Sequence, residues 1–137
     1  MGLIHLDAGV VIGLLDADDA HHETANAAIA RIMGSRDRLA MAASAFTECL
    51  VGPQRRGHRE VAVVEDLFEQ LPIEIVDLDP SIARRAAALR AHHARLRLPD
   101  ALVIATAVER SADELITTDR RWPTRQALKL TASITLL

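Results

Sequence analysis

The chain has 137 residues, half of them apolar, and 19 acidic against 16 basic residues give it a net charge of −3. A chain of this length buries roughly two-thirds of its unfolded surface around one core, so we expect a single domain over residues 1–137. No apolar run approaches the ~20 residues of a membrane-spanning helix, which argues against membrane association and predicts a cytoplasmic location. The lone Cys49 has no partner for an internal disulfide.

Short apolar runs alternate with stretches of helical periodicity along the whole chain. The predicted strands cover residues 3–6, 39–42, 73–79, 115–118 and 131–136. The predicted helices cover residues 10–16, 19–33, 44–51, 57–70, 80–96 and 99–110, with Asp19, Ser44 and Asp79 as N-caps and the Gly52-Pro53 pair as a break. This alternation predicts a three-layer α/β/α fold with a mainly parallel, five-stranded sheet.

Four acidic residues each sit where an apolar run gives way to a predicted helix start or turn: Asp7, Glu48, Asp100 and Asp119. Taken singly, each has an ordinary interpretation as a turn residue, a cap or an exposed helical side chain. In a parallel sheet, however, strand ends and the following helix starts share one edge, so the four carboxylates are expected to converge. Clustered carboxylates raise one another's pKa, and the usual compensation is a hard divalent cation with oxygen ligands. The sequence therefore predicts a site for Mg²⁺ or Mn²⁺ and a metal-dependent phosphate chemistry.

The net negative charge does not exclude a polyanionic partner, because the 19 acidic residues less these four leave 15 against 16 basic ones. Basic residues follow two of the acids. They are Arg55, Arg56 and Arg59 beyond Glu48, and Arg120, Arg121 and Arg125 beyond Asp119. We expect them to steer a nucleic-acid backbone toward the site through phosphate contacts, without base readout.

Other catalytic chemistries find no support in the sequence. The pairs His21-His22 and His92-His93 place side chains about 100° apart on a helix, whereas two zinc ligands on one helix need i, i+4 spacing. No G-x-S-x-G motif or Gly-rich phosphate loop is present, and Cys49 lies in an apolar stretch where a small buried residue is usual. Water is therefore the expected nucleophile, and Trp122 is expected to pack rather than to stack on a base.

At this point the chain resembles a known family, the PIN-domain ribonucleases, and most closely the VapC-type toxins of bacterial toxin–antitoxin pairs. The resemblance covers nearly the whole chain. It rests on the apolar strand that ends in Asp7, SAFTECLVG around Glu48, LPDALVIATA around Asp100 and LITTDRRW around Asp119. Thr117 matches a hydroxyl residue that often precedes the last acid of the family.

The resemblance implies a single PIN-like nuclease domain whose four acids bind Mg²⁺ or Mn²⁺ and support cleavage of single-stranded RNA. Asp7, Glu48, Asp100 and Asp119 would then be both metal ligands and catalytic residues of a metal-dependent endoribonuclease. The resemblance also implies a homodimer and a small cognate antitoxin that occludes the site.

One position departs from the family pattern, which has Ser or Asn two residues after Asp7, where this chain has Gly9. We expect the missing contact to weaken metal binding by about 10-fold to 100-fold, and Gly9→Ser to restore it. The alternative to an active enzyme is a catalytically silent PIN-like protein-interaction domain. A receiver-like phosphoacceptor domain is disfavoured, because Asp7 has no paired acid and Lys129 precedes the last predicted strand.

Overall fold

The central strand of the sheet is β1 (Leu3–Leu6), whose four residues are all buried. The computed structural model describes residues 1–137, and its five strands form one wholly parallel sheet in the order β3-β2-β1-β4-β5. The other strands are β2 (Arg38–Ala42), β3 (Glu74–Val76), β4 (Glu114–Thr117) and β5 (Ser133–Leu136). The near-continuous apolar character of β1 and β4 is what a sheet covered on both faces requires.

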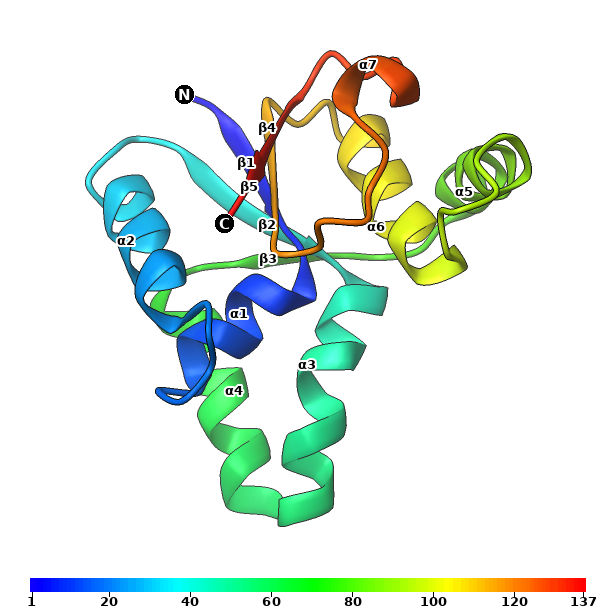
Figure 1. The fold of residues 1–137 in the computed structure, drawn as a ribbon. Coiled ribbons are helices and arrows are strands. Elements are labelled where there is room, and N and C mark those ends of the chain that lie inside the picture. Colours follow the sequence, from blue (N-terminus) through cyan, green and yellow to red (C-terminus); the bar gives the residue numbers. More distant parts are fainter.

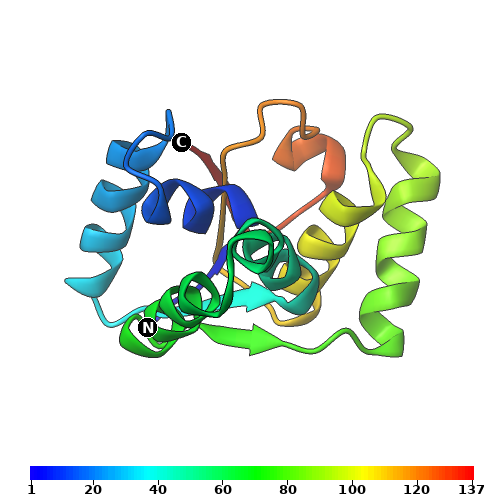
Figure 2. The same ribbon diagram turned by 90° about the horizontal axis from the view of Figure 1, so that it is seen from below.

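Helices cover both faces of the sheet. They are α1 (Ala8–Leu15), α2 (His22–Met33), α3 (Ala43–Arg56), α4 (His58–Gln70), α5 (Pro80–His92), α6 (Leu98–Glu109) and α7 (Arg125–Leu128). Figure 1 shows α1 and α2 on one side of the strands and α5 and α6 on the other. Seen from below, α2 and α5 lie at opposite sides of the molecule with the strands between them (Figure 2). The predicted three-layer α/β/α fold is therefore confirmed.

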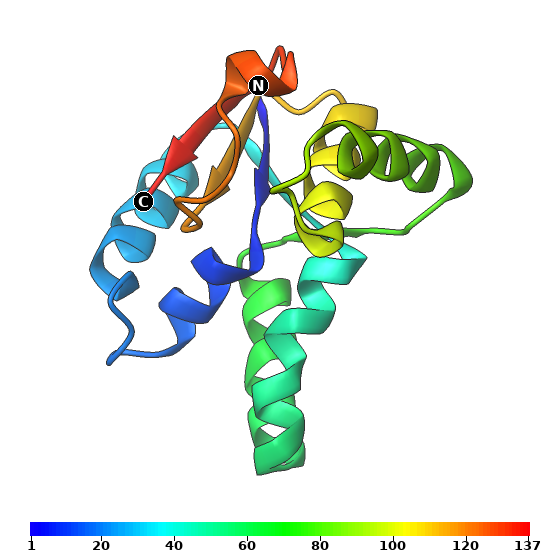
Figure 3. The same cartoon turned by 45° about the vertical axis from the view of Figure 1, so that its right-hand side comes forward.

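Helices α3 and α4 form a hairpin that extends beyond the sheet, past the end of β1 (Figure 3). None of the seven helices combines the length and the apolar character that a membrane crossing needs.

The ends of β1 and β4 mark the point where the chain direction across the sheet reverses. From β1 the chain passes through α1 and α2 to β2 on one side, and β4 leads through α7 to β5 on the other. Ligands of open parallel sheets bind in the crevice at such a switch point, beyond the carboxyl ends of the strands. The two strand ends are joined directly, since the backbone N–H of Asp7 donates to the Ile116 carbonyl at 2.9 Å.

Three predictions about helix ends are wrong. Helix α2 begins at His22, and Asp19 instead closes the preceding turn by accepting a hydrogen bond from the His21 N–H at 2.8 Å. Helix α3 begins at Ala43, so Ser44 is inside it and its buried hydroxyl caps nothing. The helix also continues through the Gly52-Pro53 pair to Arg56, because buried Pro53 lies in the last turns and the left-handed backbone of Gly57 (φ 134°) is what ends the helix.

The edges of the sheet are shorter than the apolar runs predicted. Strand β3 has three residues instead of residues 73–79, and β5 begins at Ser133 instead of residue 131. Each edge strand pairs on one side only, so its length is set by the neighbouring strand and not by its own apolar residues. Asp79 does cap α5, as predicted, but that helix ends at His92 and Leu96 is buried in the following loop.

Candidate active site

The four predicted acids line one cleft at the carboxyl edge of the sheet, with a volume of about 400 Å³. Four separate segments supply them. Asp7 is the N-cap of α1, Glu48 lies in the second turn of α3, Asp100 lies in the first turn of α6, and Asp119 follows β4. The cleft therefore lies at the switch point between β1 and β4, where the parallel sheet predicts it.

Asp7 is the most buried of the four, with 8% of its surface exposed. Its Oδ1 accepts a hydrogen bond from the Ala8 N–H at 2.8 Å, and its Oδ2 accepts one from the Thr117 hydroxyl at 2.8 Å. Thr117 Oγ1 in turn accepts the Asp119 N–H at 3.1 Å. A single hydroxyl thus orients the carboxylate at the end of β1 and the backbone at the end of β4.

Burial raises the pKa of the Asp7 carboxyl above its usual value. The hydrogen bonds from Thr117 and Ala8 oppose this effect, whereas the charges of Asp100 and Asp119 add to it. The carboxylates are therefore close enough to repel one another.

Glu48 lies at the rim of the cleft with an exposed side chain. Partial desolvation raises the pKa of its carboxyl, and the charges of Asp7 and Asp100 raise it further against the opposing charge of Arg97. Glu48 thus belongs to the same electrostatic cluster, although it comes from a helix and not from a strand end.

Arginine side chains neutralise the other two acids. Arg121 grips Asp119 with two bonds, from Nε to Oδ1 at 3.1 Å and from Nη2 to Oδ2 at 3.0 Å. These hydrogen bonds lower the pKa of the Asp119 carboxyl. Arg97 contacts Asp100 more loosely, with 3.5 Å between Nε and Oδ2.

The chemistry of the donor set fits a hard divalent cation, because carboxylate oxygens are the ligands that Mg²⁺ and Mn²⁺ prefer. As the side chains are placed, no three acidic, histidine or cysteine residues are near enough to hold one ion together. An ion that used all four carboxylates would have to displace Arg121 from Asp119.

The predicted basic residues lie in three different places. Arg120 and Arg121 line the cleft, whereas Arg125 donates to the carbonyls of Leu130 and Thr131 and holds the turn after α7. Arg55, Arg56 and Arg59 lie at the tip of the α3–α4 hairpin, outside the cleft.

Residues that sequence reasoning set aside take the expected places. Cys49 is 2% exposed, and burial raises the pKa of its thiol to about 12, so it is no nucleophile. Trp122 packs against the core. Sequence reasoning missed Arg97 and Thr118 as cleft residues, and their positions next to the LPD and TTD segments are the signals that point to them.

The structure changes the interpretation of Gly9. A Cβ atom built on Gly9 would overlap Thr118 Oγ1. The expectation that Gly9→Ser restores a missing contact stays a prediction, because a serine there must first displace the Thr118 hydroxyl.

The family model of the PIN domain matches residues 4–127 of this chain. No curated protein sequence gives a significant match. Among solved structures, the toxin–antitoxin complex from Klebsiella pneumoniae is similar at 27% identity with a TM-score of 0.66, over 85% of this chain and 86% of that one. VapBC2 from Rickettsia felis, bound to a DNA fragment from the promoter, gives a TM-score of 0.74 at 13% identity over 98% of both chains.

A third similar structure is VapC20 from Mycobacterium tuberculosis, a toxin that cleaves the sarcin-ricin loop. Its TM-score is 0.66 at 19% identity, over 82% of this chain and 86% of that one. These structures share the parallel α/β fold, and the family model spans nearly all the elements that build the cleft. This chain therefore belongs to the PIN domain family.

Proposed function

We propose that this protein is a toxin nuclease, and specifically a metal-dependent endoribonuclease that cleaves single-stranded regions of RNA. Asp7, Glu48, Asp100 and Asp119 would hold Mg²⁺ or Mn²⁺ and carry catalysis. The observation that carries the proposal is that acids from four separate segments line one cleft at the switch point of the sheet. Membership in the PIN family and the fold shared with VapC toxins support it.

We assign different roles to the residues of the cleft. Thr117 and the Ala8 N–H hold the Asp7 carboxylate, which lines the cleft, in one orientation. Glu48 at the exposed rim is placed to accept a proton from an attacking water, since its pKa lies above the usual value. A divalent ion held by these carboxylates would supply a water of lowered pKa and stabilise the charge on the scissile phosphate.

The test is RNA cleavage by the purified chain, free of any antitoxin, with and without Mg²⁺ or Mn²⁺. Asp100→Asn should abolish cleavage while the fold stays intact or becomes slightly more stable, because one negative charge leaves the cluster. Asp66→Asn is the matched control, because Asp66 is an exposed acid of α4 that does not line the cleft. This variant should cleave RNA like the wild type. Full activity in Asp100→Asn would refute the assignment of the site.

A catalytically silent interaction domain is the second candidate. The observation in its favour is that arginines contact two of the four acids and no three ligands are near enough to hold an ion as placed. This candidate is correct if the wild-type chain cleaves none of a varied set of RNAs at millimolar Mn²⁺.

Arg55, Arg56 and Arg59 are proposed to bind the RNA backbone. They lie about two turns of helix beyond Glu48, roughly 10 Å along α3 and into the start of α4. Replacing all three by Ala should raise KM and flatten its salt dependence with kcat nearly unchanged. If KM and its salt dependence stay at the wild-type values, these arginines are ordinary solvated surface.

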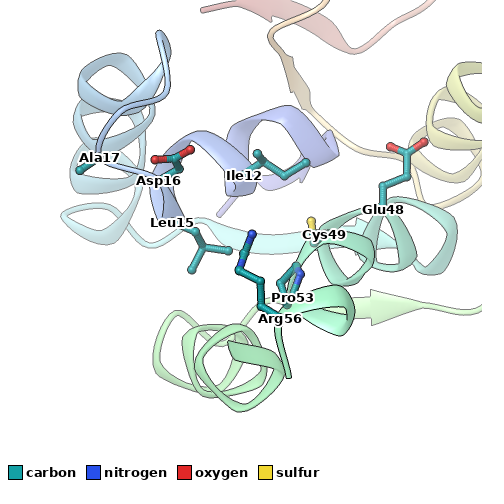
Figure 4. A pocket seen from close by; sticks show the side chains of 9 residues that line it. Ile12, Leu15, Asp16, Ala17, Glu48, Cys49, Pro53 and Arg56 are labelled. Carbon is teal, nitrogen blue, oxygen red and sulfur yellow. The ribbon is translucent and has the colours of Figure 1, made fainter. Parts of the chain in front are cut away.

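The proposal includes a cognate antitoxin that covers the site. A second cleft, of about 400 Å³, lies between α3 and the end of α1 with the turn after it, and it meets the carboxylate cleft at Ile12 and Glu48. Figure 4 shows apolar Leu15 and Pro53 in this cleft with Arg56 extending among them. An antitoxin segment with an apolar face fits the apolar part of this lining, with Arg56 as its one basic side chain.

The antitoxin proposal is tested by asking whether the adjacent reading frame encodes a small protein and by adding that protein to the cleavage assay. Its addition should inhibit cleavage, and Ile12→Glu at the junction of the two clefts should weaken the inhibition. The proposal also includes a homodimer, checked by the solution mass, and action on RNA in the cytoplasm.

A further inference from the structure

Backbone geometry does not require a glycine at position 9. Its backbone lies outside the left-handed region that side chains avoid, and Gly57 is the one glycine with positive φ. What excludes a side chain at Gly9 is the neighbouring Thr118. A Cβ on Gly9 would overlap Thr118 Oγ1 and lie 3.3 Å from Thr118 Cβ and 3.5 Å from its Cγ2.

Thr118 follows Thr117, and the hydroxyls of the two residues have different surroundings. The Thr117 hydroxyl is buried and fully used, since it donates to Asp7 and accepts from Asp119. Thr118 is half-buried and lines the cleft together with the four acids, and its hydroxyl has no hydrogen-bond partner within the chain. Successive residues of an extended segment face opposite sides, which accounts for this division.

We propose that Thr118 is a positioning residue of the cleft, and that Gly9 is a glycine because Thr118 needs the space above it. The Thr118 hydroxyl would hydrogen-bond a water beside an ion bound at the carboxylates of the cleft. It thereby does from the end of β4 what a polar side chain on residue 9 would do from α1. This inference rests on the proposed function.

The first arm of the test measures Mn²⁺ binding to the antitoxin-free chain, from the signal of free Mn²⁺ in electron paramagnetic resonance. Thr118→Val removes the hydroxyl at nearly constant shape and should weaken binding by about 10-fold to 100-fold, the usual cost of losing a partner that orients a metal site. Thr118→Ser keeps the hydroxyl and should bind like the wild type. The Mn²⁺ concentration for half-maximal cleavage should move in parallel, with KM for RNA unchanged.

The second arm needs no metal and measures thermal unfolding. Gly9→Ser alone should lower the melting temperature, because the new Cβ meets Thr118 Oγ1. Adding Thr118→Ala to Gly9→Ser should recover most of the loss, since the overlapping oxygen is gone and the remaining Cβ–Cβ contact of 3.3 Å needs only a small shift. The double variant also returns a hydroxyl to the cleft, and its Mn²⁺ affinity should exceed that of Thr118→Ala alone.

The outcomes separate this inference from the proposed function. Wild-type protein that binds no Mn²⁺ at millimolar concentration overturns both. Wild-type binding that Thr118→Val leaves unchanged overturns the role of Thr118 alone. Strictly additive effects of Gly9→Ser and Thr118→Ala on the melting temperature overturn the spatial exchange between the two residues.

Discussion

Replacing His5 by Leu should change how the stability of this protein depends on pH. His5 lies in the central strand β1, is 1% exposed, and neither ring nitrogen has a hydrogen-bond partner. Burial lowers the pKa of His5 from 6.5 to about 4, helped by the charge of Arg110 and opposed by that of Glu74. The folded protein therefore holds this imidazole neutral, whereas the unfolded chain takes up a proton near pH 6.5.

The unfolded state binds more protons than the folded state between these two values, so the free energy of unfolding falls as the pH falls through them. The stability is complete above pH 6.5 and is lost progressively toward pH 4. The difference between 6.5 and about 4 corresponds to about 3 kcal/mol, of which about 2 kcal/mol is lost by pH 5.

Urea unfolding of the wild type and of His5→Leu at pH 7.5 and at pH 5 measures this effect. The raised pKa of Asp7 acts in the opposite direction, but it is present in both proteins and cancels in their difference. His5→Leu should be close to the wild type or more stable at pH 7.5, and it should gain about 2 kcal/mol on the wild type at pH 5. His58→Leu is the matched control for loss of a surface histidine. A gap between wild type and His5→Leu that is the same at both pH values would show that His5 is not held neutral by burial.

Three further predictions concern the cleft. Arg121→Ala should tighten Mn²⁺ binding by about 2-fold to 5-fold in the absence of RNA, because it frees the Asp119 carboxylate from a weak, exposed ion pair; weaker binding, measured by titration, would contradict this. Thr117→Val should lower stability by about 1–2 kcal/mol and weaken Mn²⁺ binding, because Asp7 loses a buried hydrogen bond; a variant with wild-type melting and affinity would show that the bond is unimportant. Asp7→Asn should raise the melting temperature of the metal-free protein near pH 7, because burial raises the pKa of Asp7 and disfavours its charge, and this gain should shrink at acidic pH as wild-type Asp7 takes up a proton.

The positions of the four acids in the fold followed from the sequence because they depend on topology. In a parallel sheet the ends of β1 and β4 and the start of α6 must meet at one edge, whatever the details of packing. Asp7, Asp100 and Asp119 needed only that rule, and the structure places all three in one cleft. Glu48 needed in addition that α3 start directly after β2, which the chain achieves without a capping side chain.

The contacts between side chains did not follow from the sequence. Whether Arg121 turns back onto Asp119 or points to solvent depends on rotamers that no periodic pattern records. The space over Gly9 is filled by Thr118, more than 100 residues away in the chain, so it is visible only once the strands are in register. Pro53 was likewise misread as a helix end, because its burial outweighs the hydrogen bond that a proline removes.

The hydrogen bond from Thr117 to Asp7 joins residues 110 positions apart, and this separation has a consequence for synthesis. A ribosome makes the first strand long before the fourth, and the sheet contact that orients the first acid needs both. Contacts between such distant segments close late in folding, because the loop between them must be ordered first. Most of the polypeptide is therefore finished before its cleft exists, so a nascent chain has no assembled site. If the protein is a toxin, the interval between synthesis and folding is also the time in which a partner made beside it finds its target.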